Sequence, residues 1–344
     1  MNRVLVTGGC GFIGSHLVIR YLDKNPDACV FVVDDQSNAS TDFQDTDLRV
    51  RTILAGLIDG YTLHFDSMNP QVVLIQGDFA HPKVLALLVC NPFDAVFHFA
   101  AQPRVEVSVK EPEAVTNENL NKTLKLARAC AQANVRLVFS STGAIYGNTE
   151  VIPTHESVNH QPTNPYGLSK YCAEQYLAMF EDLYGLDWVA LRYFNVYGPR
   201  EQHKGSMSSV AFHFNNQIKD TGVCKLFGET EGWGAGEQRR DFVYVGDVVK
   251  VNLWFWQQRA ASGIYNLGTG KCQSFNDVAD AVVAWHGAKG TDGKKEYIPF
   301  PDHLKGAYQS FTEADISNLR AAGYTDEFFT VEQGVNAYLD WLNG

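Results

Sequence analysis

The sequence contains no apolar run of 18 or more residues, which excludes a membrane-spanning helix of ordinary length. No signal-type apolar stretch follows Arg3, which leads directly into a short apolar run at 4–6. The seven cysteines are scattered, without a Cys-x-x-Cys pair or the spacing of a zinc site. We therefore expect free thiols, no metal site, no membrane partner and a cytoplasmic location.

Positive charge is also scarce. Lys and Arg number 28 against 39 Asp and Glu, so the net charge is -11. Nucleic acids and anionic membranes are bound by clustered Lys and Arg, and the sequence argues against both partners. A phosphate ligand must instead be held by local groups, such as a helix N-terminus and a few arginines.

What the sequence does contain is a regular alternation of short apolar runs with helical segments. The runs lie at 4–6, 30–33, 72–75, 95–99 and 135–139, and the clearest helical segments at 13–22 and 113–132. This alternation predicts an α/β fold, a Rossmann-type doubly wound parallel sheet with helices on both faces.

The length of 344 residues and a change of texture after 198 predict a second, smaller mixed α/β substrate lobe. We expect residues 1–197 and 240–268 to form the NAD(P)-binding domain, and residues 198–239 and 269–344 to form the lobe. The segment 35–72 is longer than a crossover needs. It predicts a helix over 48–57 and otherwise a polar loop, either a lid or an oligomer contact.

A glycine-rich turn follows the first apolar run. Gly8, Gly11 and Gly14 have the spacing that lets the backbone approach a pyrophosphate at a helix N-terminus. Asp34 ends the second run and is placed to accept hydrogen bonds from a ribose, which favours NAD over NADP. Asp78, after the third run, is placed either to meet an adenine edge or to cap a turn.

Tyr166 and Lys170 are four residues apart and share one face of a predicted helix. A neighbouring ammonium favours the tyrosinate form, so we expect Lys170 to lower the pKa of the Tyr166 phenol. A phenol with a lowered pKa can act as a base near neutral pH. We also expect Lys170 to hold the nicotinamide ribose.

These features, with the runs 98–101, 140–142, 192–199 and 240–245, resemble the extended short-chain dehydrogenase/reductases that act on nucleotide sugars. The resemblance covers essentially the whole chain. It implies homo-oligomers, built through the helices near 113–132 and 165–182, and a Thr142 hydroxyl that hydrogen-bonds the reacting sugar hydroxyl. A strand-end cap is the other interpretation of Thr142. The cofactor contacts that the family resemblance implies are Gly8, Gly11, Phe12, Ile13, Gly14, Asp34, Asp35, Asp78, Phe99, Ala100, Ala101, Asn119, Ser140, Tyr166, Lys170 and Val196.

The residues after Thr142 limit the type of reaction that the family resemblance allows. Family members that dehydrate or decarboxylate carry an acidic residue within two positions of that hydroxyl, whereas Gly143 and Ala144 follow here. No carboxylate is placed to run an elimination. Oxidation followed by return of the hydride, which is epimerisation, remains.

The second half resembles the ADP-L-glycero-D-manno-heptose 6-epimerase family over 202–207, 209–213, 225–227, 297–301, 304–312 and 319–324. That resemblance implies two acid–base groups, Tyr166 and Lys204, although a loop lysine that binds phosphate or ribose is the alternative for Lys204. His213 by itself is more typical of a packed or capping histidine. The substrate contacts that the resemblance implies are Asn195, Ser206, His213, Phe227, Arg240 and Tyr308, with Arg240 on the pyrophosphate.

The front half departs from the heptose pattern, because 100–104 and 156–166 look more like UDP-hexose 4-epimerases. Three hypotheses therefore stand: an ADP-heptose 6-epimerase, a UDP-hexose (glucose or N-acetylglucosamine) 4-epimerase, and an NAD-binding sensor without catalysis. NADP stays open as the cofactor. The partner in the first two hypotheses is a nucleotide-diphosphate sugar.

Overall fold

The computed structural model describes residues 3–41, 43, 46–54, 70–230, 232–259, 261–302 and 309–344. Its internal contacts divide the chain into two units. Unit 1 comprises Met1–Gly147, Asn159–Arg192 and Val249–Tyr265, and unit 2 comprises Asn148–Val158, Tyr193–Val248 and Asn266–Gly344.

An eight-stranded sheet has the order β12-β7-β6-β5-β1-β2-β4-β3. Its strands are β1 (Arg3–Thr7), β2 (Cys29–Asp34), β3 (Val50–Leu54), β4 (Val72–Gln76), β5 (Ala95–His98), β6 (Arg136–Thr142), β7 (Trp188–Tyr193) and β12 (Gly263–Leu267). The neighbouring pairs from β3 through to β6 are all parallel. The predicted Rossmann-type parallel sheet is confirmed.

The strand order places a switch point beside β1. The chain first builds outward from β1 to β2 on one side and then crosses to β5 on the other. Ligands of open α/β sheets bind at the carboxyl ends of the strands where the order reverses in this way. The turns after β1 and β5 are therefore the first place to look for a bound dinucleotide.

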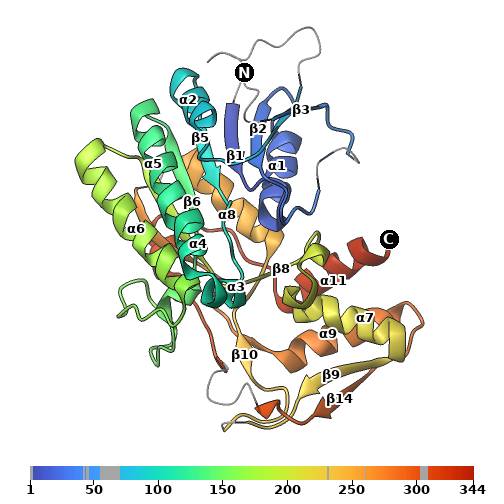
Figure 1. The fold of residues 1–344 in the computed structure, drawn as a ribbon. Helices are drawn as coiled ribbons and strands as arrows, with labels where there is room; N and C mark the ends of the chain where they lie inside the picture. Colours follow the sequence, from blue (N-terminus) through green and yellow to red (C-terminus); the bar gives the residue numbers. More distant parts are fainter. Residues whose placement is uncertain are drawn as a thin grey trace. The chain divides into compact units, whose positions relative to one another are not determined.

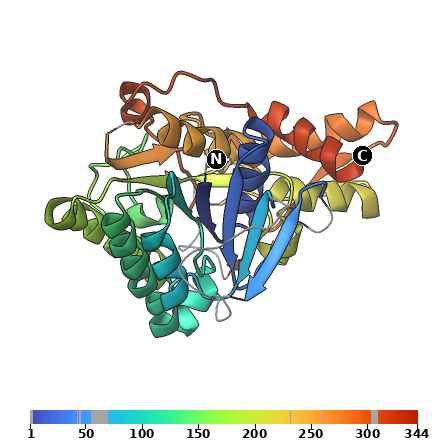
Figure 2. The same cartoon turned by 90° about the horizontal axis from the view of Figure 1, so that it is seen from above.

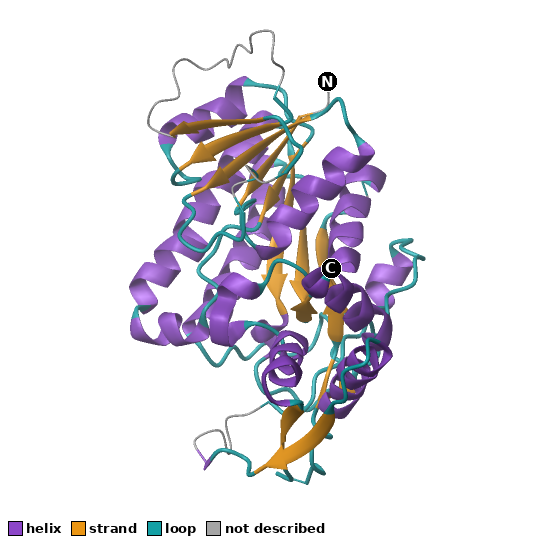
Figure 3. Cartoon of the chain, turned by 90° about the vertical axis from the view of Figure 1, so that its right-hand side faces the viewer, coloured by secondary structure: helices purple, strands orange, loops and turns teal. Residues whose placement is uncertain are grey.

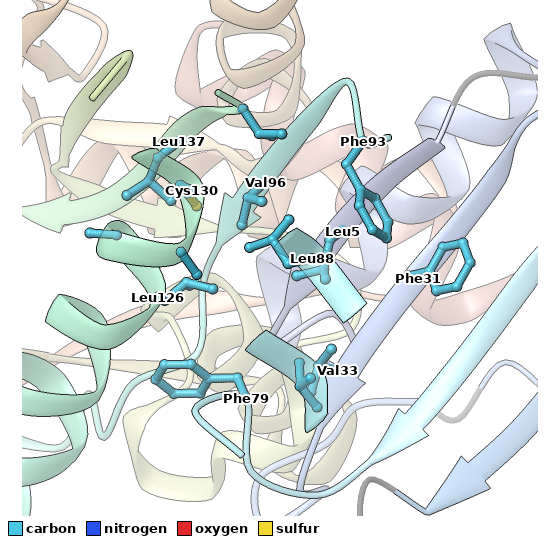
Figure 4. Packing of buried hydrophobic residues seen from close by; sticks show 14 of the residues in the cluster. Leu5, Phe31, Val33, Phe79, Leu88, Phe93, Val96, Leu126, Cys130 and Leu137 are labelled. Atoms are coloured by element: carbon cyan, nitrogen blue, oxygen red, sulfur yellow. The ribbon is translucent and has the colours of Figure 1, made fainter. Parts of the chain in front are cut away.

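Helices cover both faces of this sheet (Figures 1 and 2). One face carries α2 (Pro82–Cys90), α5 (Lys122–Ala133) and α6 (Pro165–Tyr184), and the other carries α1 (Phe12–Lys24) and α8 (Val245–Gln258). On the first face the sheet residues Leu5 and Val96 pack against Leu88 and Leu126 of the helices in a continuous apolar core (Figure 4). A fully buried leucine of this kind contributes about 1.5–3 kcal/mol by leaving water.

Two expected elements differ from the observed ones. The expected helix over 113–132 is present, but as α4 (Pro112–Thr116) and α5 joined by a π-helical turn, Asn117–Asn121. The expected helix over 48–57 is wrong, because Val50–Leu54 forms strand β3 and pairs with β4 at the edge of the sheet. Residues 55–57 of that prediction lie outside the described residues, as does most of the predicted lid or oligomer contact.

Unit 2 is a mixed α/β assembly, in which short strands lie in pairs beside helices (Figure 3). Its elements are β8 (Asn195–Tyr197), the 3-10 helix η4 (Gln202–Met207), α7 (Val210–Thr221), β9 (Val223–Phe227), β10 (Arg239–Arg240), β11 (Phe242–Tyr244), β13 (Gln273–Ser274), α9 (Phe275–Ala288), β14 (Lys294–Ile298), α10 (Ser317–Ala321) and α11 (Val331–Asn343). Strand β8 pairs with β11, β9 with β14, and β10 with β13. Capping boxes at Ser274 and Thr330 start α9 and α11, which pack on each other around Val282 and Val335.

Among the residues that the structure describes, no helix combines the length and the apolar character needed to cross a membrane.

Candidate active site

The glycine turn after β1 is built for close backbone approach. Gly8 has a φ of +68°, a conformation that favours glycine, and a Cβ there would lie 2.5 Å from the backbone nitrogen of Ala100. A Cβ at Gly14 would lie 2.2 Å from the carbonyl oxygen of Gly8. The turn after β1 is thus packed directly on α1 and on the chain that leaves β5, and no side chain larger than hydrogen fits at either glycine.

The start of α1 offers its backbone to an anion. Gly11 is the N-cap residue, its backbone is extended, and no side chain caps the helix. The first N–H groups of a helix, here those of Phe12 and Ile13, lie at the positive end of the helix dipole. These residues fit the pyrophosphate of a dinucleotide, as the sequence predicts.

The carboxylate of Asp34 ties this turn to the end of β2. It accepts hydrogen bonds from the backbone N–H of Cys10 at 2.9 Å and of Gln36 at 2.8 Å. Burial raises the pKa of Asp34, and these two hydrogen bonds oppose the rise. Asp35, next to it, accepts a hydrogen bond from the N–H of Ser37 at 2.9 Å. A ribose contact of Asp34 would therefore add to a structural role that the residue already has.

Asp78 adopts the turn arrangement that the sequence left as its alternative. One carboxylate oxygen accepts a hydrogen bond from the N–H of Ala80 at 2.8 Å, and the other lies 3.1 Å from the ammonium of Lys122. This ion pair joins the end of β4 to the first turn of α5. An adenine contact of Asp78 stays a prediction.

The loop after β5 is held by Asn119, which the π-helical turn carries into a buried position. Its amide accepts a hydrogen bond from the N–H of Gln102 at 2.8 Å and donates to the Gln102 carbonyl at 3.1 Å and to the Ser169 hydroxyl at 3.2 Å. Asn119 thereby fixes the segment that follows Phe99, Ala100 and Ala101. These three hydrogen bonds are all with other residues of the chain.

Thr142, Tyr166 and Lys170 come together at the end of β6 and the start of α6. The Thr142 hydroxyl accepts a hydrogen bond from the N–H of Ala144 at 3.1 Å, and the Thr142 side chain also hydrogen-bonds the Tyr166 phenol. Thr142 therefore caps a short helix, η3 (Gly143–Tyr146), and also pairs with the phenol. The Lys170 ammonium donates to the carbonyl of Ser140 at 2.9 Å.

The pKa values of this pair differ from the expectation. Burial raises the pKa of Tyr166, and the hydrogen bond from Thr142 opposes that rise. The expected lowering of the phenol pKa by Lys170 is wrong for the chain as it stands in this structure. Burial also lowers the pKa of Lys170 to about 7, so the amine loses part of its positive charge near neutral pH.

Lys204 lies in η4 of unit 2, where its amine is 3.2 Å from a carboxylate oxygen of Glu201. Glu201 is fully buried and also accepts hydrogen bonds from the N–H and the hydroxyl of Ser209, at 2.9 and 2.5 Å. Burial lowers the pKa of Lys204, and Glu201 opposes that shift. A partly exposed amine with a lowered pKa is suited to accept and return a proton.

The predicted substrate residues of unit 2 fall into exposed and packed groups. Asn195 and Ser206 are exposed, whereas Phe227 packs edge-on against Phe300 at 5.3 Å. Val196, a predicted cofactor contact, pairs with Val243 in β8 and β11. His213 lies on α7 beside Phe212. Tyr308 lies outside the described residues.

Arg240, the predicted pyrophosphate partner, is buried. Its guanidinium lies over the ring of Phe275, 5.8 Å from the centroid, and donates to the carbonyl of Arg239 at 2.9 Å. The backbone of Arg239 also forms two hydrogen bonds with the segment 310–312. A phosphate contact of Arg240 stays a prediction.

Sequence reasoning missed three charged residues near the predicted catalytic groups: Glu201, which contacts Lys204, Glu174, which acts on the charge of Lys170, and Arg192, the partner of Glu174. Glu174 follows Lys170 by four residues, Glu201 precedes Lys204 by three, and Arg192 binds Glu174. The helical spacing Tyr166, Lys170, Glu174 was the available signal for the first. Nothing local in the sequence connects Arg192 to Glu174, because they lie on different elements.

Comparison with known proteins identifies the family of this chain. Residues 4–268 match the NAD dependent epimerase/dehydratase family. An ADP-L-glycero-D-manno-heptose-6-epimerase from Alkalilimnicola ehrlichii is 39% identical over 337 residues, which cover 98% of this chain and 96% of that protein.

Two solved structures share the fold over nearly the whole chain. A UDP-N-acetylglucosamine 4-epimerase from Methanobrevibacter ruminantium M1, in complex with UDP-N-acetylmuramic acid, has a TM-score of 0.80 at 29% identity and covers 99% of this chain and 98% of that one. The ADP-L-glycero-D-manno-heptose-6-epimerase of Helicobacter pylori has a TM-score of 0.77 at 27% identity and covers 99% of this chain and 96% of that one. With a glycine turn that fits a dinucleotide, and a family match over most of its length, the chain belongs to the NAD-dependent epimerase/dehydratase family and is an NAD-dependent enzyme.

Proposed function

We propose that the chain inverts one carbon of a nucleotide-diphosphate sugar, and that this carbon is C6 of an ADP-glyceromanno-heptose. One observation carries the proposal: two ionisable side chains that can exchange protons each have a close polar partner, Tyr166 beside Thr142 and Lys204 beside Glu201. The 39% identity to an ADP-L-glycero-D-manno-heptose-6-epimerase over 98% of the chain supports the sugar.

The chemistry of C6 explains why two groups are needed. Held at the turn of Gly8 and Gly14, NAD would supply a reversible acceptor for the hydride of the sugar carbon. Tyr166 accepts the proton of the reacting hydroxyl in one orientation, with Thr142 orienting that hydroxyl. C6 is outside the ring, so the oxidised carbon turns about its neighbouring bond, and Lys204 handles the proton in the other orientation.

The residues around Thr142 support epimerisation rather than elimination. Gly143 and Ala144 form the first turn of η3 and have no side chain that can transfer a proton. An elimination needs an acid to protonate the leaving hydroxyl. The expected product is therefore an isomer of the substrate, formed without loss of water.

Substitution of each acid–base group tests the proposal. We expect the purified protein to convert ADP-glyceromanno-heptose to its C6 epimer, followed by NMR, and to leave UDP-glucose and UDP-N-acetylglucosamine unchanged. Tyr166→Phe and Lys204→Met should each lower kcat by 100-fold or more, in the range of lost general acid–base catalysis. Lys225→Met is the matched control, because Lys225 is an exposed lysine of unit 2 on β9. Full activity of Lys204→Met would overturn the two-group mechanism.

A UDP-hexose 4-epimerase is the second candidate. The solved UDP-N-acetylglucosamine 4-epimerase shares the fold over 99% of this chain, and residues 100–104 and 156–166 resemble that class. In that reaction the whole ring must turn over, and Lys204 has no proton to handle. Inversion of a UDP-hexose at C4 by both wild type and Lys204→Met would favour this candidate.

We propose that the predicted cofactor and substrate residues have the roles that the sequence predicts, with residues 1–197 and 240–268 holding NAD and residues 198–239 and 269–344 holding the sugar. The glycine turn and the pairing of Thr142 with Tyr166 support the first assignment. We also propose that the reaction takes place in the cytoplasm, since all seven cysteines are free thiols.

We propose further that the protein is a homo-oligomer joined through α6. Leu168, Tyr176, Met179 and Leu183 are exposed at helical spacing along this helix. Such a continuous apolar stripe is typical of a surface that another chain covers. Light scattering after chromatography should show a smaller particle for Met179→Glu with Leu183→Glu, but not for Val89→Glu on α2. An unchanged mass for the double variant would overturn this interface.

A further inference from the structure

Behind the predicted catalytic pair lies a buried ion pair that the proposed chemistry does not use. Glu174 follows Tyr166 and Lys170 on α6 at intervals of four, so the three side chains share one face of the helix. Glu174 and Arg192 of β7 are both fully buried. The Arg192 fork binds the carboxylate through two hydrogen bonds, of 2.7 and 3.0 Å.

The Glu174 carboxylate also reaches the strand that carries Thr142. The Ser141 hydroxyl, one residue before Thr142, donates to Glu174 at 2.5 Å. One carboxylate therefore connects α6, β6 and β7. A buried ion pair is favourable only when the remaining hydrogen-bonding positions are also satisfied, and this contact satisfies one of them.

Arg192 extends the network to the segments on either side of the site. It donates to the phenol of Tyr146 at 3.0 Å and contacts the ring nitrogen of His160 at 2.9 Å. Its guanidinium also lies over the Tyr146 ring, 4.9 Å from the centroid. Tyr146 ends η3, which Thr142 caps, and His160 precedes α6.

Packing at the start of α6 leaves little room for the site to shift. A Cβ at Gly167, next to Tyr166, would lie 2.9 Å from the carbonyl oxygen of Ala144 in η3. The helix that carries the phenol thus touches the turn that carries the threonine. A change in the angle of α6 would separate Tyr166 from Thr142.

The charge on Lys170 depends on few neighbours. Its amine lies 4.7 Å from the centroid of the Phe139 ring, and the ionisable groups that interact with it are His98 on β5 and Glu174, whose partner Arg192 lies on β7. Burial lowers the pKa of His98 well below its ordinary value, so its ring is neutral at working pH. Glu174 raises the pKa of Lys170 against the effect of burial.

We infer that Glu174 and Arg192 are positioning residues for Tyr166 and Lys170. Their ion pair holds α6 against β6, and the negative charge of Glu174 favours the ammonium form of Lys170. This role rests on the proposed function, in which Tyr166 and Lys170 act on the sugar and the cofactor.

The test is Glu174→Gln in the full-length protein with NAD bound. The pKa of Lys170 is read by NMR of protein labelled with 13C at the lysine ε-carbon, with Lys170→Met giving the assignment. We expect this pKa to fall by about one unit, because a neighbouring negative charge is lost. The alkaline limb of kcat should move to lower pH by the same amount, since an ammonium with a lower pKa is lost earlier as pH rises.

Two further variants separate charge from geometry. Ser141→Ala removes one hydrogen bond but keeps the charge, so the Lys170 pKa should stay unchanged. Arg192→Lys keeps both charges but loses the fork, so kcat should fall at least tenfold, with KM and the alkaline limb unchanged. If Glu174→Gln does not fold, Glu174→Gln with Arg192→Gln removes both buried charges and should show a shift of the same sign.

An unchanged Lys170 pKa in the folded Glu174→Gln variant, or in the double variant, would overturn the charge role. Full kcat in Arg192→Lys would overturn the geometric role. The NMR measurement needs no sugar. A protein that epimerises nothing but shows the shift would therefore refute the proposed function while supporting the influence of Glu174 on Lys170.

Discussion

Replacement of Gly14 by alanine isolates the fit of the glycine turn to its cofactor. Gly14 is helical, so alanine meets no backbone strain there and would gain about 1 kcal/mol in helix propensity in an open position. Its Cβ, however, would lie 2.2 Å from the carbonyl oxygen of Gly8, a backbone atom. The turn must move, at a cost of about 1–3 kcal/mol, which equals or exceeds the gain.

A displacement of this kind falls on the backbone that we propose to contact the pyrophosphate. We expect the free energy of unfolding to change by less than about 2 kcal/mol, and the affinity for NAD to fall at least tenfold, or about 1.4 kcal/mol. Isothermal titration with NAD measures the affinity, and urea unfolding without NAD measures the stability. The two readings separate a lost ligand site from a damaged fold.

Gly287 provides the matched control. It is also a helical glycine, in the last turn of α9, and a Cβ there would meet nothing within 4 Å. Gly287→Ala should raise stability by about 0.5–1 kcal/mol and leave NAD affinity unchanged. Wild-type affinity in Gly14→Ala would refute the close-approach argument, as would an equal loss in both variants.

Three more predictions follow from buried charge. Arg192→Met leaves the Glu174 carboxylate buried without its arginine partner. Urea unfolding at pH 7 should therefore show a free energy of unfolding lower by about 3–5 kcal/mol. A decrease of less than about 1 kcal/mol would contradict the burial of that charge. Lys170 has a folded pKa of about 7 against an ordinary value of 10.5, so the folded chain binds fewer protons than the unfolded chain between these pH values. The contribution of Lys170 to the free energy of unfolding should therefore rise with pH across that window, by up to about 1.4 kcal/mol per pH unit. The difference in this free energy between wild type and Lys170→Met, measured from pH 7 to 10, gives the slope. The absence of a slope would mean that the amine is solvated. Glu201→Gln should move the Lys204 pKa further down, and a pH profile of kcat identical to wild type would argue against the contact between them.

The sequence predicts the sheet and the turn well because their signals are local. A continuous apolar run that ends at Gly8 identifies a buried strand and its turn without knowledge of any partner. Strand β3 was mistaken for a helix because Val50, Ile53 and Leu54 are also spaced as on a helix face. Its pairing with β4, from which it is separated by residues 55–71, decides the outcome, and no window over 48–57 contains that information.

The side-chain chemistry of the site was less predictable for a related reason. Burial is a property of the folded chain, and it determines the direction of the pKa shifts at Tyr166 and Lys170. The acceptors of Asp34 and Asn119 are engaged by backbone groups from other segments, which a motif does not reveal. Residue types at the site follow from the sequence, whereas their protonation and partners follow from the fold.

The most direct test of the central claim uses ADP-glyceromanno-heptose that carries deuterium at C6, incubated with the protein and NAD in ordinary water. Transient transfer of a hydride predicts that NMR shows the C6 epimer with deuterium retained at C6. Loss of the deuterium to solvent, or recovery of the unchanged sugar at enzyme concentrations that bind it, would contradict the account.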